Sequence, residues 1–258
     1  MNRLHASKDF WLAALRADSP ALQDALAQAG PGAAVPSCEG WTVADLTAHL
    51  TGMLHWVRET VARGVTDHPP AFVPPAFVED ESRLEWDAAL DGLRRELTGT
   101  TETLEALEAD FPAWNWAPQA KTAGFWQRRM AHEISVHRWD AEAAAGRATP
   151  VETKLAADGI SEVLDSWLPA GKRKGPTDLH GVAHLIASDA GYEWFVRLRG
   201  PGVALLDTGT ILDSDDHHPR AGASGTASDL LLTLMGRRRT DGLVISGDPR
   251  LISALRTG

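Results

Sequence analysis

The chain has 258 residues, of which 43% are hydrophobic and 23% are charged, and its formal net charge at pH 7 is −10. This composition is ordinary for a globular protein, and ten tryptophans are more apolar surface than a disordered chain leaves in water. An acidic chain lacks the basic surface that binds a nucleic-acid backbone, so we expect no nucleic-acid partner. No segment supplies the roughly 20 apolar residues of a membrane span, so we also expect no membrane partner.

The N-terminal residues and the cysteine content both bear on whether the protein is secreted. Residues 1–9 contain neither the apolar segment nor the small-residue cleavage site of a secretory signal. Cys38 is the single cysteine, so the chain can form no internal disulfide. Both observations predict a cytoplasmic protein.

Helical patterns occupy most of the chain up to Trp167. Thr42, followed three positions later by Asp45, is a variant of the capping box that starts a helix. The proline-rich residues 68–75 and the tryptophan-rich residues 111–118 are typical of loops. Long helices are therefore expected from Lys8 to Gln28, from Thr42 onward, from Glu79 to Ala109, from Thr122 to Ala145 and from Glu152 to Trp167. Mostly short connections between long amphipathic helices predict a helical bundle.

The composition changes at residues 169–176, PAGKRKGP, which is typical of a linker. Beyond it, Asp248 and Pro249 predict the cap and the first residue of a last helix. Short strands are expected at residues 194–198, 203–206 and 243–246, and a further helix at residues 228–235. We therefore predict an α+β protein with a helical domain over residues 1–170 and a small α/β domain over residues 171–258.

Glu133 and His137 fall on the apolar face of the fourth expected helix, beside Trp126 and Met130, and Asp140 lies near the same face. Burying a carboxylate and an imidazole costs several kcal/mol unless they pair or bind a metal ion. Spacing of i, i+4 stacks both side chains on adjacent turns, where they can converge on one ion. The residues alone leave two interpretations open, a structural hydrogen-bonded pair and two ligands of a metal site.

A third ligand is available on the second expected helix. His49 lies at the edge of the apolar stripe and His55 near the outer face, so only His49 is placed to reach a site between helices. By itself, His49 also fits a histidine at the edge of a core. Joined to Glu133 and His137, it completes a set of two histidines and one carboxylate. Such a set suits catalytic zinc with an open fourth position, and it also suits non-haem iron.

The sequence that begins with His132-Glu133 does not match the H-E-x-x-H motif of zinc proteases. The H-E-x-x-H pattern requires a second histidine where this chain has Val136. His132 and His137 point about 140° apart on a helix, so they cannot easily share an ion. We therefore expect no metalloprotease.

Three segments of the chain resemble one known family. Residues 38–50 read CEGWTVADLTAHL, residues 126–142 read WQRRMAHEISVHRWDAE, and residues 225–238 read GTASDLLLTLMGRR. The first two resemble the helical signatures of the mycothiol-dependent maleylpyruvate isomerase family, within the DinB-like superfamily, and the third resembles part of its second domain. The resemblance covers nearly the whole chain. It implies a DinB-like up-and-down four-helix bundle followed by a small α/β C-terminal domain.

The resemblance also implies a metal site and a thiol cosubstrate. The family's ligands fall on His49, Glu133 and His137, which would hold zinc or another divalent metal. The open position takes the low-molecular-weight thiol mycothiol as a thiolate. The thiolate adds to an electrophilic carbon of a small-molecule substrate, either in a maleylpyruvate-type cis–trans isomerisation or in S-transfer.

A basic residue of the second domain is further implied, to hold a substrate carboxylate. Arg237 and Arg238 are the expected catalytic residues, although surface charge is the plainer interpretation of both. Arg138 is less suited, because its position about 100° from the ligand face favours a structural ion pair. Trp114 and Trp116 either line a pocket for an apolar electrophile or plug the bundle, and we favour the plug.

Two other classes of function fit the same residues. One is a non-catalytic metal-binding regulator with a closed site on the same bundle. The other is a small-ligand carrier, in which the second domain binds an apolar molecule and Glu133 and His137 form a structural pair. Metal content and thiol-dependent turnover distinguish these classes from the enzyme.

Overall fold

The computed structural model describes residues 6–72, 83–206 and 219–258. Contacts between residues divide the chain into two compact units. The bundle unit comprises residues 6–115 and 119–149. The sheet unit comprises residues 116–118 and 150–258.

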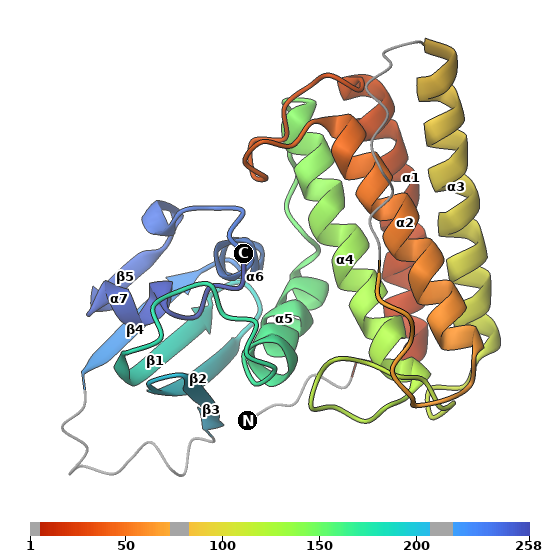
Figure 1. Cartoon of the computed structure of the whole chain (residues 1–258). Helices are drawn as coiled ribbons and strands as arrows, with labels where there is room; N and C mark the ends of the chain where they lie inside the picture. Colours follow the sequence, from red (N-terminus) through yellow and green to blue (C-terminus); the bar gives the residue numbers. More distant parts are fainter. Residues whose placement is uncertain (1–5, 73–82, 207–218) are drawn as a thin grey trace. The chain divides into compact units, whose positions relative to one another are not determined.

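The bundle unit is an up-and-down bundle of four helices (Figure 1). Its helices are α1 (Lys8–Ala29), α2 (Val43–Ala62), α3 (Arg83–Ala106) and α4 (Ala123–Ala144). The most extensive packing joins α1 to α4 and α2 to α3. Leucines dominate the buried interior, which includes Leu15, Leu22, Leu26, Leu46, Leu50, Leu54, Leu93 and Leu104. The structure confirms the expected helical bundle.

Local sequence signals set the helix ends in this unit. α1 begins after Ser7, whose hydroxyl accepts a hydrogen bond from the backbone three residues later, and it ends at Gly30, where φ is 79°. Thr42 and Asp45 form the expected capping box before α2, because each side chain accepts a hydrogen bond from the other residue's N–H. The expected start of the third helix at Glu79 lies outside the described residues.

The sheet unit contains a mixed five-stranded sheet (Figure 1). The strand order is β3-β2-β1-β4-β5, in which β1 and β4 are parallel and the other neighbours are antiparallel. The strands are β1 (His180–Ala187), β2 (Tyr192–Arg199), β3 (Gly202–Leu206), β4 (Arg220–Gly225) and β5 (Val244–Gly247). The helices are α5 (Thr153–Glu162), which a π-helical turn (Val163–Trp167) continues, α6 (Ala227–Leu234) and α7 (Pro249–Ser253). The three expected strands and the two expected helices are present.

One face of the sheet forms the core of this unit. Paired residues of neighbouring strands, such as Leu185 of β1 and Trp194 of β2, are buried on it. The helices α6 and α7 pack against β1 and β4. The same face carries the buried residues Ala183, Val196, Leu198, Ala221 and Ala223. Alternation of buried and less buried positions along β2 follows the period of two that a half-buried strand requires.

The helix α5 packs against α6 and belongs to the sheet unit. A Cβ added at Gly159 of α5 would lie 2.9 Å from Leu231 Cδ2 of α6, so a larger residue there would displace the leucine. The backbone N–H of Val151 donates to Ser228 Oγ at 3.0 Å and ties the segment before α5 to α6. The boundary expected at residues 170/171 places α5 with the bundle, whereas these contacts join α5 to the sheet.

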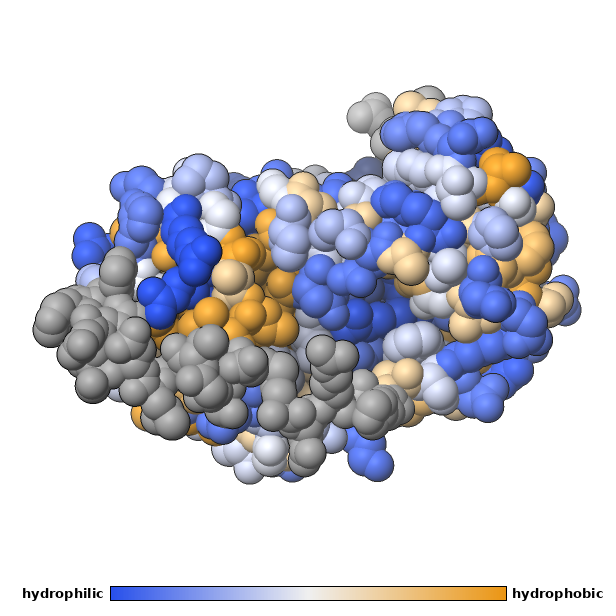
Figure 2. All heavy atoms as spheres, turned by 90° about the horizontal axis from the view of Figure 1, so that it is seen from below, coloured by the Kyte–Doolittle hydropathy of each residue, from blue (hydrophilic) through white to orange (hydrophobic). Residues whose placement is uncertain are grey.

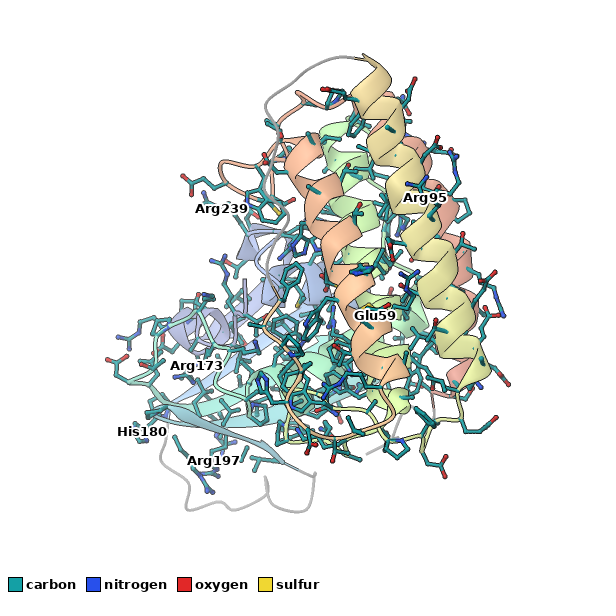
Figure 3. The ribbon with its side chains drawn as sticks, turned by 45° about the vertical axis from the view of Figure 1, so that its right-hand side comes forward. Glu59, Arg95, Arg173, His180, Arg197 and Arg239 are labelled. Atoms are coloured by element: carbon teal, nitrogen blue, oxygen red, sulfur yellow. The ribbon has the colours of Figure 1, made fainter. Side chains whose placement is uncertain are left out.

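The surface of both units is largely polar. Glu59 of α2 and Arg95 of α3 are exposed and point away from the bundle interior (Figure 3). Figure 2 shows one face, on which apolar residues gather in patches between hydrophilic ones. A membrane-spanning helix is absent from the described part of the chain, since none of its long helices has a sufficiently apolar stretch.

Replacing Thr42 by alanine removes half of the capping box. We expect the free energy of unfolding to fall by about 1 kcal/mol, because the backbone N–H of Asp45 in the first turn of α2 loses its side-chain acceptor. Urea denaturation followed by circular dichroism measures the change. Thr98→Ala is the matched control, since Thr98 lies within α3 and donates to the carbonyl of Arg94 one turn earlier. Equal losses in the two variants would contradict a capping role for Thr42.

Candidate metal centre

Three side chains from two helices converge inside the bundle unit. His49 comes from α2, and Glu133 and His137 come from successive turns of α4. Glu133 Oε1 lies 3.6 Å from His49 Nε2 and 3.2 Å from His137 Nε2. One ligand atom from each residue lies within 4.8 Å of the other two. Among the described residues, this is the group of histidine, cysteine and carboxylate side chains that could hold a metal ion.

Glu133 is largely buried, with 15% of its side chain exposed. Its second oxygen, Oε2, accepts a hydrogen bond from Arg129 Nη2 at 2.9 Å. Burial by itself raises the pKa of Glu133, but hydrogen bonds from His137 and His49 and the charge of Arg129 outweigh it and hold the pKa well below its usual value. Burial lowers the pKa of His137, but its bonds to Asp140 and Glu133 outweigh that effect, and the pKa is raised.

A second carboxylate fixes the orientation of His137. Asp140 is fully buried, and it accepts hydrogen bonds from His137 Nδ1 at 2.8 Å and from Ser37 Oγ at 2.5 Å. In the neutral tautomer that donates from Nδ1, the lone pair of Nε2 faces Glu133 and His49. A carboxylate behind a histidine is the usual arrangement for a metal ligand, because it fixes the ring and raises its basicity.

The donor set fits a divalent metal ion. Two imidazole nitrogens and one carboxylate oxygen are ligands for zinc and for non-haem iron. Three protein ligands leave a position for a further ligand, as in catalytic zinc sites. The exposed fraction of the side chain falls from 27% for His49 to 15% for Glu133 and 6% for His137. A further ligand would therefore approach from the side of His49.

The sequence matches the family described as the mycothiol maleylpyruvate isomerase N-terminal domain over residues 12–142, just over half of the chain. That range contains all three residues of the cluster. The chain belongs to this family. The bundle unit accounts for the family's domain, and the sheet unit follows it in the chain.

Two solved structures related to this family share the fold of the chain. One is a crystal structure of the mycothiol-dependent maleylpyruvate isomerase, with a TM-score of 0.60 and 15% identity over 95% of this chain and 96% of that chain. The other is a mutant of the mycothiol-dependent maleylpyruvate isomerase in which one histidine is replaced by alanine, with a TM-score of 0.61 and the same identity and coverage. A comparison with curated proteins gives no match.

The other candidate residues of the bundle unit lie outside the cluster. His55 is exposed, as its place on the helix predicts, and its Nδ1 lies 3.4 Å from Glu96 Oε1. Arg138 is buried, and its Nη1 lies 2.8 Å from Glu142 Oε1. This contact agrees with the structural ion pair that we expect for Arg138 from its position on the helix, about 100° from the ligand face. His132 is buried, and it is not a member of the group that could hold a metal ion.

The two expected catalytic arginines follow α6 in the sheet unit. Arg237 Nη1 donates to the carbonyl of Met235 at 2.8 Å, and Arg238 forms an ion pair with Asp229 of α6. The next residue, Arg239, is exposed (Figure 3). A role of Arg237 and Arg238 in substrate binding stays a prediction.

The tryptophan-rich loop contributes to both units. Trp114 belongs to the bundle unit, where its ring centroid lies 6.1 Å from that of Trp56 and its carbonyl accepts from Trp126 Nε1 at 2.5 Å. Trp116 belongs to the sheet unit, where its ring lies 5.0 Å from that of Trp167. Trp114 therefore contacts α2 and α4, and the choice between a plug and the lining of a pocket stays a prediction.

Asp140 and Arg129 contact the candidate ligands at spacings that are visible in the sequence, although the sequence alone assigns them no role in the site. Asp140 lies three residues after His137, which is the spacing that lets a carboxylate reach Nδ1 from the next turn. Arg129 lies four residues before Glu133, which is the spacing of an ordinary helix ion pair. Ser37 comes from the loop before α2, and no local pattern connects it with α4.

Replacing Asp140 by asparagine keeps the size of the side chain and removes the charge behind His137. We expect the affinity for zinc to fall about 10- to 100-fold, because the ring loses the partner that orients it. Competition with a chromophoric chelator measures this affinity. Glu142→Gln is the matched control, since Glu142 is a buried carboxylate on the same helix that pairs with Arg138. If both variants lose zinc affinity equally, Asp140 does not position His137.

Proposed function

We propose that this chain is a zinc- and mycothiol-dependent enzyme, in which the thiolate of mycothiol adds to an electrophilic carbon of a small substrate. The observation that carries the proposal is the convergence of His49, Glu133 and His137 within the domain that defines the family. The two solved structures with the same fold are of a mycothiol-dependent maleylpyruvate isomerase, which supports the thiol and the reaction class. We place the enzyme in the cytoplasm, where Cys38, the single cysteine of the chain, stays reduced.

Each residue of the site has a distinct task in this proposal. His49, Glu133 and His137 would hold the metal ion through the atoms that lie within 4.8 Å of one another. Arg129 holds the second oxygen of Glu133, which leaves Oε1 facing the two histidines. Asp140 holds Nδ1 of His137 and keeps Nε2 directed at the same point.

When bound, a divalent metal ion lowers the pKa of a coordinated thiol, so that the thiol is present as thiolate at neutral pH. The sulfur then forms a bond with one carbon of a cis double bond. In isomerisation, rotation about the resulting single bond and cleavage of the carbon–sulfur bond give the trans product and return the thiol. In S-transfer, the adjacent carbon takes a proton and the thioether leaves. The chain's own residues position the reactants and exclude water from the buried side of Glu133 and His137.

We also propose that Arg237 and Arg238 bind a substrate carboxylate. A guanidinium group binds a carboxylate through two parallel hydrogen bonds. A substrate carboxylate would compete with Asp229 for Arg238, since these two residues form an ion pair in the structure. Arg237 donates to the backbone carbonyl of Met235, and a substrate carboxylate would compete with that carbonyl.

The metal content of purified full-length protein tests the ligand set. We expect about one zinc ion per chain by inductively coupled plasma mass spectrometry. Glu133→Ala and His137→Ala should lose the ion, because each removes a ligand. His55→Ala is the matched control and should retain it, because the exposed His55 faces Glu96. Zinc retained by Glu133→Ala, or lost equally by His55→Ala, would contradict the assignment of the ligands.

Thiol-dependent turnover tests the chemistry. We expect the wild-type protein and mycothiol to consume maleylpyruvate or another electrophile, and His49→Ala to lower kcat/KM by about 100-fold or more. A chelator should inactivate the wild type, and added zinc should restore it. Equal turnover by the wild type and His49→Ala, after subtraction of the spontaneous reaction, would overturn the mechanism.

The same two measurements identify the other classes of function. A metal-binding regulator would hold zinc tightly and show no thiol-dependent turnover. A small-ligand carrier would contain no metal and would co-purify with an apolar molecule. In the second case Glu133 and His137 are a structural pair.

A further inference from the structure

Aromatic side chains border the more exposed side of the ligand cluster. The ring of Trp41 lies edge-on to His49 with centroids 5.2 Å apart, and the ring of Phe72 does so at 6.4 Å. Trp41 and Phe72 are both partly exposed residues. His49 is itself the most exposed member of the cluster, at 27% of its side chain. A molecule that approaches the donor atoms past His49 therefore meets two aromatic rings.

Phe72 is held in place by a group of tryptophans. The ring centroid of Trp56 on α2 lies 6.2 Å from that of Phe72, and Trp56 Nε1 donates to the carbonyl of Pro70 at 2.9 Å. Trp56 in turn packs against Trp114 and Trp126, with centroids 6.1 and 5.8 Å apart. The backbone that carries Phe72 is thus tied to α2 next to the metal-binding residues. The resulting aromatic wall, Trp41, Phe72 and Trp56, is part of the bundle unit and is built before any ligand binds.

The aromatic wall itself offers no positive charge to a carboxylate. Arg129, the cation that contacts Glu133, has 4% of its side chain exposed and gives its Nη2 to Glu133 Oε2. A carboxylate placed against Trp41 and Phe72 would lose water and gain no ion pair from these rings. An alkyl or aryl group in the same place removes apolar surface from water and stacks against the rings.

We infer that Trp41 and Phe72 form a subsite for the apolar part of the substrate, and that the enzyme prefers electrophiles with an alkyl or aryl substituent. This inference rests on the proposed function for the place of the reacting carbon, and it favours S-transfer over isomerisation of a small dicarboxylate. The balanced reaction is the addition of a thiol S–H across a carbon–carbon double bond. The sulfur bonds to the β-carbon, the π bond breaks, and the proton goes to the α-carbon.

The test compares electrophiles that share a reactive group. Zinc-loaded full-length protein and mycothiol are given benzyl acrylate, methyl acrylate or monomethyl fumarate, which carry an aryl group, a methyl group and a carboxylate respectively. We expect kcat/KM of the wild type to be about tenfold higher for benzyl than for methyl acrylate, after correction for the spontaneous rates. Phe72→Ala should remove most of this ratio, and Phe72→Leu should keep part of it because an apolar side chain remains.

The control variant is Phe10→Ala, which removes a partly exposed phenylalanine from the first turn of α1. It should keep the wild-type ratio, and all variants should contain the same amount of zinc. A benzyl-to-methyl ratio that is the same in the wild type and Phe72→Ala would overturn the inference. A loss of kcat/KM in Phe72→Ala that is as large for monomethyl fumarate as for benzyl acrylate would also overturn it.

A binding measurement separates this inference from the proposed function. If no electrophile is consumed, the proposed function fails, and the subsite is tested with benzyl propionate, a saturated analogue that cannot react. Isothermal titration calorimetry should then give a Kd about tenfold weaker for Phe72→Ala than for the wild type. Equal affinities, or no binding to the wild type, would rule out the aromatic subsite.

Discussion

A carboxylate inside a helical bundle needs compensating partners, and Glu133 sets this requirement for the bundle unit. Arg129 and His137 supply two of them from the preceding and following turns of α4, and His49 supplies the third from α2. Without these partners, burial would favour the neutral acid, which is a poor metal ligand. The polar residues on the otherwise apolar face of α4, together with His49 of the neighbouring α2, therefore act jointly. They keep the negative charge of the Glu133 carboxylate at a fixed place inside the bundle.

The parts of the fold that depend on local patterns could be predicted from the sequence. Thr42 and Asp45 predict the start of α2, because residues three apart can form two side chain–backbone hydrogen bonds there, and the structure has both. Strand β4 (Arg220–Gly225) was not expected, because RAGASG contains no β-branched or aromatic residue. It becomes a strand through its parallel pairing with β1, which no local pattern reports. The contact of Gly159 with Leu231 likewise joins α5 to the sheet through residues far apart in the chain.

The candidate site also contains residues that local patterns predict and residues that only tertiary contacts place. Helix periodicity alone puts Glu133 and His137 on one face, and the partner from α2 follows from its place on its own helix. Ser37 and Phe72 lie in loops, and their places beside Asp140 and His49 depend on how those loops return to the bundle. The three residues of the candidate metal centre can thus be predicted from helix geometry. The places of Ser37 and Phe72 beside them depend on tertiary contacts.

The arrangement of the ligands has a mechanical consequence for the bundle. α4 packs mainly against α1, and α2 packs mainly against α3, yet the cluster takes one residue from α2 and two from α4. An ion held there would be a cross-link between the two helix pairs, and it would close a long loop of chain between His49 and Glu133. Its binding free energy would add to the cohesion of the bundle. Loss of the ion would therefore weaken the cohesion between the α1–α4 pair and the α2–α3 pair.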